Sequence, residues 1–250
     1  MSAKTHIAHH TNEAIYVRDT DLVKDLIGKV SFTEMMFLQI TGKRPTSAQV
    51  VLLDAAMVTL MEHGLTPSVI ATRMVYISAP EAMQSAVAAG LLAVGSTFVG
   101  TMELAIKLIE EILAAPEGEA TRALAIAKRH RESKKPLPGF GHHMHKPDDP
   151  RSACLLGLAQ EQGTPGHHVR ALRTLSSAID EVYGRHFTIN ATGAVAAILG
   201  EIGFPQEVMR GVAVVSRAAG LVGHILEEQR EPAARQMWEA IENEVPYEPG

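Results

Sequence analysis

The sequence predicts an all-α protein, folded as one compact multi-helix unit. Only 4% of the 250 residues are aromatic, whereas 46% are hydrophobic, so the core must be filled mainly by aliphatic and methionine side chains, which suit helices. Helix-start signals recur along the chain, and no sustained segment alternates between apolar and polar residues. The stretches VSF and HFTIN are too short to predict a sheet.

Capping boxes predict the first two helices, at 31–42 and 46–64. The second helix is apolar around most of its circumference, so we expect it to be central, with His63 in its last turn. The ends, 1–14 and 245–250, are expected to be loose. Hydrophobic periodicity predicts the remaining helices at 68–77, 81–94, 101–115, 119–134, 152–163, 166–183, 190–202, 205–228 with a break near Gly211, and 233–242.

Charge and cysteine content exclude several classes of protein. A formal net charge of -5 argues against a general nucleic-acid binder, because such binding needs clustered cations. The single cysteine, Cys154, excludes an intrachain disulfide and is expected to be a small buried residue. With no secretory apolar segment near the start, we expect a cytoplasmic protein. The uncharged run 82–102 is long enough to span a membrane, but its polar residues and glycines favour a buried helix and turn.

The loop GFGHHMHKPDDPR, residues 139–151, holds most of the acid–base capacity of the chain. Prolines and glycines prevent a continuous helix here, so its polar groups lie on a loop. His142 is a candidate general acid or base, because an imidazole titrates near neutral pH. Gly139 and Gly141 allow backbone N–H groups to approach a ligand, and Lys146 and Arg151 can hold anions.

Two other hypotheses use the same part of the chain. A metal site could be built from His142, His143, His145 and Asp148 or Asp149, with His167 and His168 nearby in the sequence, although the spacing matches no helical zinc motif. A nucleophilic mechanism is weaker, since Cys154 lies just inside a predicted helix and no Gly-x-Ser-x-Gly motif exists.

The loop motif resembles the signature of the citrate synthase superfamily, in which Gly-x-Gly-His is followed by a basic residue and Asp-Pro-Arg. The segments TGKRPT, MEHG, INATGAVAAILGEIGFP and VVSRAAGLVGHILEEQ are similar to further motifs of that family. The chain lacks much of the N-terminal part of full-length citrate synthases. In size, and in AAGLLAVGSTFVGTMELA, it is most similar to citryl-CoA lyases, including the lyase module of ATP-citrate lyase.

The resemblance assigns roles residue by residue. It makes His142 the group that handles the proton on the oxygen of oxaloacetate or of the citryl hydroxyl. His63, Arg151 and Arg217 would bind the oxaloacetate portion, since arginines suit carboxylates. The CoA-binding residues implied in the same way are Pro138, Gly139, Phe140, Gly141 and Lys146.

Two positions depart from the citrate synthase pattern. The histidine that steadies the acetyl-CoA enol in synthases is Phe98 here, as it is in the lyase module. The family's catalytic aspartate is Thr192, which cannot act as a carboxylate base. A water held by Thr192 and Asn190 could deliver the proton instead, or the chemistry could differ. Cleavage is less demanding than synthesis, because an enolate can take its proton from water.

The resemblance therefore implies a citrate synthase-like fold in its short form and retro-Claisen cleavage of citryl-CoA to acetyl-CoA and oxaloacetate. A large helical part would comprise 14–115 and 190–250, and a smaller CoA-side part 116–189. We expect no metal, no tightly bound cofactor, no nucleic acid and no membrane partner, a CoA thioester as substrate, and a homodimer or higher homo-oligomer. The alternatives are a different 3-hydroxy-acyl-CoA, a synthase, or a CoA- or oxaloacetate-binding protein with impaired catalysis.

Overall fold

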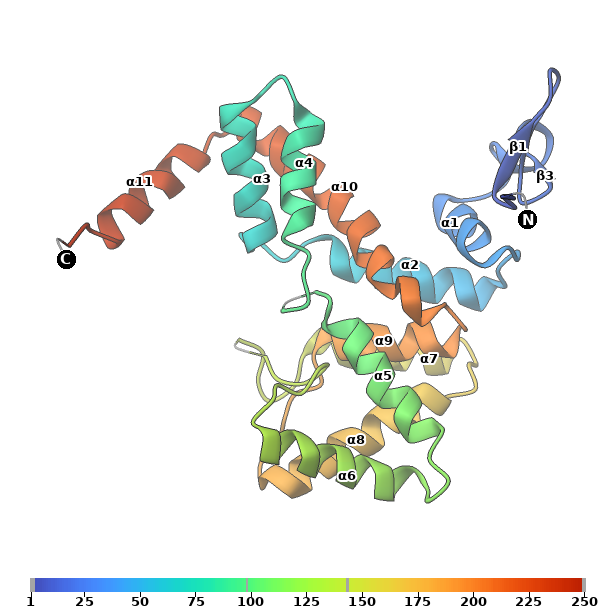
Figure 1. The fold of residues 1–250 in the computed structure, drawn as a ribbon, viewed down its shortest axis with the longest axis vertical. Coiled ribbons are helices and arrows are strands. Elements are labelled where there is room, and N and C mark those ends of the chain that lie inside the picture. Colours follow the sequence, from blue (N-terminus) through green and yellow to red (C-terminus); the bar gives the residue numbers. More distant parts are fainter. Residues whose placement is uncertain (1–2, 98, 143, 249–250) are drawn as a thin grey trace.

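A computed structural model describes residues 3–97, 99–142 and 144–248, and the prediction of an all-α protein is confirmed. Figure 1 shows the helices as several packed layers. Their bounds are α1 Phe32–Thr41, α2 Ser47–Met61, α3 Pro67–Ser78, α4 Met83–Leu92, α5 Thr101–Leu113, α6 Glu119–Ser133, α7 Pro150–Glu161, α8 His167–Tyr183, α9 Ala191–Glu201, α10 Met209–Arg230 and α11 Ala234–Glu244.

Both predicted capping boxes are present. The side chains of Ser31 and Thr46 each accept the backbone N–H of the residue three positions ahead. In turn, the side chains of Glu34 and Gln49 accept the backbone N–H of Ser31 and Thr46. The first helix ends at Gly42, whose φ of 73° lies in the left-handed region that glycine adopts without strain. Local hydrogen bonding therefore sets the start of α1 and α2, as the sequence indicates.

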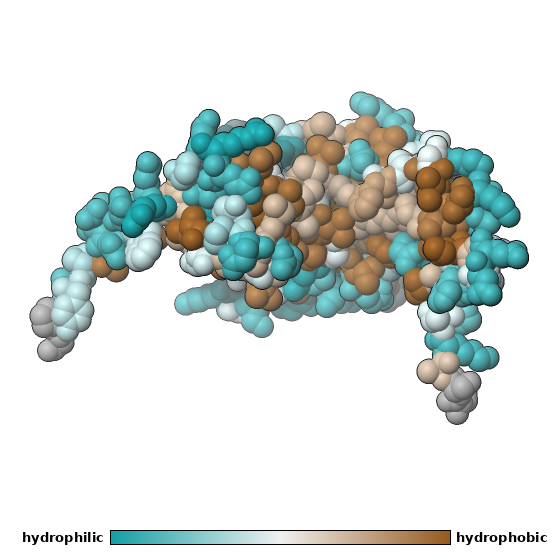
Figure 2. Space-filling model, turned by 90° about the horizontal axis from the view of Figure 1, so that it is seen from above, coloured by the Kyte–Doolittle hydropathy of each residue, from teal (hydrophilic) through white to brown (hydrophobic). Residues whose placement is uncertain are grey.

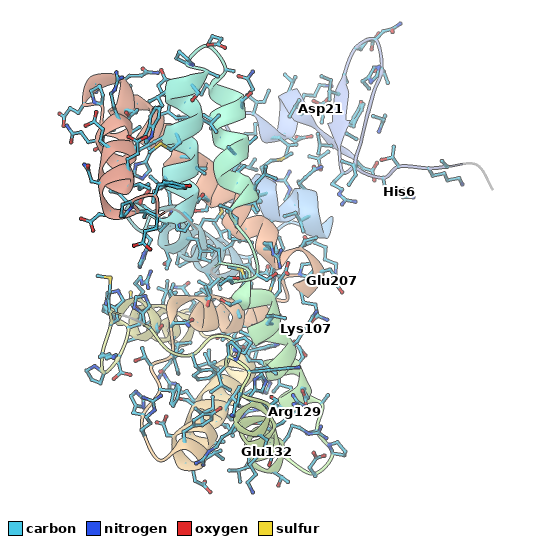
Figure 3. All side chains as sticks on the ribbon, turned by 60° about the vertical axis from the view of Figure 1, so that its left-hand side comes forward. His6, Asp21, Lys107, Arg129, Glu132 and Glu207 are labelled. Carbon is cyan, nitrogen blue, oxygen red and sulfur yellow. The ribbon has the colours of Figure 1, made fainter. Side chains whose placement is uncertain are left out.

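The N-terminal segment differs from the expectation of a loose end. It forms a small antiparallel sheet of order β1-β2-β3, with bounds Ala8–His10, Ile15–Val17 and Thr20–Asp21, followed by a π-helical turn, η1, at Leu22–Leu26. The strands are too short to produce a periodic pattern, and for this reason they were not predicted. Figure 3 shows His6 and Asp21 on this segment, outside the helical body.

The break predicted near Gly211 is also wrong. A short 3₁₀ turn, η2, covers Gln206–Val208, and α10 then runs without interruption from Met209 to Arg230. Glycine weakens a helix without removing its hydrogen bonds, so packing can hold it in helical form. The segment Gln206–Arg230 is long and apolar enough to cross a membrane by length and composition, a test that core helices of water-soluble proteins also pass.

Cys154 is exposed and not buried as expected. The residues of α7 that face the core are Ser152, Leu155, Leu156 and Ala159, and their spacing of three and four places Cys154 on the outer side of the helix.

Helix α9 lies at the centre of the fold. Val195, Ala196, Ala197 and Ile198 have no exposed surface, and α9 packs against α2, α5, α7 and α8. Above it in Figure 1, α10 packs on α2 and on the α3–α4 pair, while α6 pairs with α8 below. Figure 2 shows the described segments near the two termini projecting from the body, with apolar residues gathered on the face between them. The division into a large and a smaller part stays a prediction.

The start of α9 touches the backbone of the segment 139–151, called the histidine loop from here on. A Cβ added to Gly193 would lie 2.5 Å from the carbonyl oxygen of Gly139, which leaves no room for a side chain. The backbone N–H of Asn190 donates to the same oxygen at 3.0 Å. Gly141 N–H donates to Thr188 O at 2.7 Å, and Phe140 and Ile189 form an isolated bridge. The loop is therefore fastened directly to the central helix.

We expect Gly193→Ala to destabilise the protein by about 1–3 kcal/mol, because the loop must move away from α9 to admit a methyl group. Gly157→Ala in α7 is the matched control, because its Cβ would meet nothing within 4 Å, so alanine should be neutral or stabilising there. Urea unfolding of both variants measures the difference. Equal stability of the two would contradict the close contact.

Candidate active site

A cavity of about 1430 Å³ opens between the histidine loop, the ends of α2 and α9, and one side of α5. Nearly all of the predicted site residues line it: His63, Pro138, Gly139, Phe140, Gly141, His142, Arg151, Asn190, Thr192 and Arg217. Two further predicted residues are not placed in this cavity and stay predictions. Lys146 is exposed and is not among the lining residues, and Phe98 lies outside the described residues.

Asp149 fastens the end of the loop. Its carboxylate is fully buried and accepts the backbone N–H of Arg151 (3.0 Å), the side chain of Arg151 through Nε (3.0 Å) and Nη2 (2.8 Å), and the N–H of Ala191 at the start of α9 (3.2 Å). Burial opposes ionisation, yet the hydrogen bonds from Arg151 hold the pKa of Asp149 below its ordinary value. Asp149 therefore caps α7, orients Arg151 and ties both to α9.

The ring of His142 is held by the backbone of its own loop. Its Nδ1 accepts the N–H groups of Met144 (3.1 Å) and His145 (3.0 Å). Nδ1 thus carries no hydrogen, and in the neutral ring the hydrogen lies on Nε2. Arg151 Nη2 lies 3.4 Å from Nε2. Since both are donors in this tautomer, they do not bond each other, and a single acceptor oxygen that faces both can accept from each.

The structure also brings three histidines together. His63, His142 and His145 each offer a ring nitrogen within 4.8 Å of the others. A metal-bound histidine normally donates its second ring N–H to an acceptor. His142 instead accepts two N–H groups at Nδ1. Its hydrogen bonds therefore suit a donor at Nε2 better than a metal ligand.

The other residues of the metal hypothesis do not converge on this cluster. Asp148 pairs with His186 at 3.0 Å, and His168 pairs with Glu110 at 2.9 Å. The carboxylate of Asp149 already accepts hydrogen bonds from Arg151 and from the start of α9. His143 lies outside the described residues.

Arg217 on α10 is 5% exposed and lines the cavity. Its Nε and Nη1 are buried and have no hydrogen-bond partner among the described residues. Burial lowers the pKa of Arg217, and the negative charge of Glu62 acts in the opposite direction. A buried guanidinium with unused donors is costly, so an anionic ligand would satisfy it.

Thr192 belongs to a network of neutral polar groups. Its Oγ1 donates to Asn190 Oδ1 at 2.7 Å and lies 2.8 Å from Thr101 Oγ1. Because the single hydrogen of Thr192 is used on Asn190, Thr101 supplies the hydrogen of the second bond. Asn190 Nδ2 donates to Gly141 O at 3.0 Å, which links the network to the loop. These groups do not titrate near neutral pH.

Three basic residues of the cavity were missed by the sequence prediction: Lys107, His130 and Lys135. Figure 3 shows Lys107 on α5. His130 Nδ1 donates to Pro136 O at 2.9 Å. Helical spacing could have found the first of them, since one side of α5 faces the cavity through Thr101, Leu104, Lys107 and Leu108.

The sequence model of the family described as citrate synthase, C-terminal domain, matches residues 2–238. The chain belongs to the citrate synthase family. Citrate synthase 2 from Bacillus subtilis is 23% identical over 199 residues, which are 78% of this chain and 51% of that protein. The chain thus spans about half the length of the curated relatives that it matches.

Two solved structures superpose on all or nearly all of the chain. Citryl-CoA lyase from Hydrogenobacter thermophilus gives a TM-score of 0.89 at 32% identity, over 99% of this chain and 95% of that one. ATP citrate lyase from Methanosaeta concilii gives a TM-score of 0.80 over 100% of this chain and 42% of that one, and at 17% identity this shows the fold alone.

We expect Asp149→Asn to destabilise this citrate synthase-family chain by about 1–3 kcal/mol at neutral pH, because the amide cannot accept all of the N–H groups. Since the pKa of Asp149 is lowered on folding, its stabilisation is present above the unfolded pKa and is lost as pH falls through the folded value. The variant should therefore lose less stability than the unaltered protein below about pH 4. Thermal unfolding from pH 7 to pH 3 measures both effects. Parallel pH curves would contradict the role of Asp149.

Proposed function

We propose that the chain cleaves citryl-CoA to acetyl-CoA and oxaloacetate. One observation carries the proposal: the described residues that line the cavity include two lysines and two arginines, Lys107, Lys135, Arg151 and Arg217, and no aspartate or glutamate. A substrate with several negative charges fits this lining in a chain whose net charge is -5. The lining offers no carboxylate in the place of the family's aspartate, the base that enolises acetyl-CoA in synthases.

The two ends of the cavity suit different parts of such a substrate. Arg151, Arg217 and His63 would bind the carboxylates of the oxaloacetate portion. The exposed lysines Lys107 and Lys135 would hold CoA phosphates, and the backbone of Pro138–Gly141 would lie along the adenine. Lys107 and Lys135 replace Lys146 in this proposal, because both line the cavity. CoA enters as part of the substrate, with no tightly bound cofactor.

The hydrogen bonds of His142 suggest how it acts on the citryl hydroxyl. Its Nε2–H would donate to the hydroxyl oxygen and stabilise the alkoxide that forms there. The hydroxyl proton would pass to His63 or His145, whose ring nitrogens lie within 4.8 Å of the same cluster. Breaking the C–C bond then yields the ketone of oxaloacetate and the enolate of acetyl-CoA. The enolate takes a proton from water, and the resulting hydroxide accepts the proton from the histidine.

The neutral network around Thr192 favours cleavage over synthesis. Deprotonating the methyl group of acetyl-CoA requires a base, whereas an enolate can be protonated by water held near Thr192 and Asn190. The similarity to citryl-CoA lyase from Hydrogenobacter thermophilus extends over nearly all of both chains and also supports cleavage as the direction of the reaction.

We also propose that the chain forms a homodimer in the cytoplasm. Val51 and Val58 on α2, and Val215, Val222 and Leu226 on α10, are exposed at helical spacings of seven and four. These two helices pack against each other, so their apolar side chains can form a shared surface for a second copy.

We expect His142→Ala to lower kcat for citryl-CoA cleavage by about 10²–10⁴-fold, because it removes the group that acts on the reacting oxygen. Release of oxaloacetate, coupled to malate dehydrogenase and NADH, measures the rate. His6→Ala is the control, a histidine on the N-terminal segment. Unchanged turnover in the His142 variant would contradict its role. CoA binding without turnover in the unaltered protein would indicate a binding role or another acyl group.

Arg217→Met should weaken oxaloacetate binding by about 10- to 100-fold while leaving the melting temperature equal or higher. The reason is that methionine fills a similar volume without burying an unpaired charge. Isothermal titration calorimetry and thermal unfolding measure the two effects. A lower melting temperature with unchanged binding would assign Arg217 to stability.

A further inference from the structure

Behind the cavity, a buried ion pair connects α3 to α10. Arg73 is 2% exposed and donates from Nη1 to Glu228, also buried, at 2.7 Å. Its Nη2 lies 2.8 Å from Nδ1 of His224 and also contacts Glu227. Glu228 in turn accepts the N–H groups of residues 233 and 234 at the start of α11. Glu227 and Glu228 thus fix the guanidinium group of Arg73, which can donate a hydrogen bond to His224.

This donor determines the tautomer of His224. Arginine has no acceptor atom, so Nδ1 of His224 must accept and its hydrogen must lie on Nε2. That Nε2 is 2.8 Å from Oε2 of Glu62, which therefore receives the hydrogen. The hydrogen bonds run in one direction, from Arg73 through His224 to Glu62.

Glu62 connects His224 to the turn that carries His63, a residue of the cavity. Its Oε1 accepts the backbone N–H groups of His63 (2.8 Å) and Gly64 (2.6 Å), which shapes the turn that follows α2. Burial opposes ionisation of Glu62, yet these bonds and the one from His224 hold its pKa below the ordinary value. Its charge also acts on Arg217. Glu62 itself is not among the cavity-lining residues.

One side of α10 carries the whole arrangement, with residues spaced by three and four: Arg217, Gly220, His224 and Glu228. A Cβ added to Gly220 would lie 2.3 Å from the carbonyl oxygen of Met61, so α10 contacts the end of α2 without an intervening side chain. His224 follows one turn later and meets Glu62.

We infer that His224 and Glu62 are positioning residues of the cavity. They fix the turn that presents His63, and Glu62 supplies the negative charge that balances Arg217. The role in substrate binding rests on the proposed function. The orientation of the turn does not, because it can be measured without a ligand.

The first test is NMR of the ligand-free protein with ¹⁵N-labelled histidine. His224 should show hydrogen on Nε2 and none on Nδ1. His224→Leu should shift the ring signals of His63, whereas His224→Gln should leave them in place, because a glutamine amide can still donate to Glu62. Glu227→Gln is the control: Glu227 contacts Arg73 and lies 3.8 Å from Nδ1 of His224, on the side of the ring away from the bond between His224 Nε2 and Glu62.

The second test is kinetic. His224→Leu should raise the KM for citryl-CoA about tenfold with a smaller change in kcat, and His224→Gln should restore it. Hydrogen on Nδ1 of His224, or unmoved His63 signals in His224→Leu, would overturn the inference, as would an equal effect of Glu227→Gln. If the unaltered protein does not cleave citryl-CoA, the proposed function fails while the NMR result still decides the inference.

Discussion

The contact between two glycine backbones fixes the position of the histidine loop. Gly139 has a φ of 85°, a conformation that glycine adopts without strain, and its carbonyl group rests against Gly193 at the start of α9. Since α9 is the buried centre of the fold, these contacts hold the loop in a fixed position relative to the core. The buried carboxylate of Asp149 completes the attachment by bonding both Arg151 and the start of α9. His142 and Arg151 can therefore point at one place without a ligand to hold them there.

Charge is distributed unevenly between the cavity and its surroundings. The described lining residues carry positive side chains and no carboxylate, whereas the balancing acids, Asp149 and Glu62, stand outside the lining. Asp149 is bonded to Arg151, and Glu62 acts on Arg217 from the far side. This leaves Nε and Nη1 of Arg217 unpaired among the described residues. A site of this kind is prepared for an anion and is less stable without one.

Much of the fold and site could be predicted from the sequence where the signal was local. The capping boxes located α1 and α2, and the loop motif located His142 and Arg151. Contacts between distant segments could be predicted only where the family resemblance supplied them, as for His63, His142 and Arg217. No pattern indicated that Lys107 and Lys135 would line the cavity or that His145 would join His63 and His142. The strands at 8–21 were missed because two or three residues are too few for a periodic signal.

A comparison of the two directions of the reaction in the unaltered protein distinguishes a lyase from a synthase. Oxaloacetate release from citryl-CoA and citryl-CoA formation from acetyl-CoA and oxaloacetate would be followed on one preparation. Because no carboxylate is available at Thr192, we predict steady cleavage, together with synthesis much slower than that of a citrate synthase that retains the aspartate. Efficient synthesis, or binding of citryl-CoA without any cleavage, would contradict this prediction.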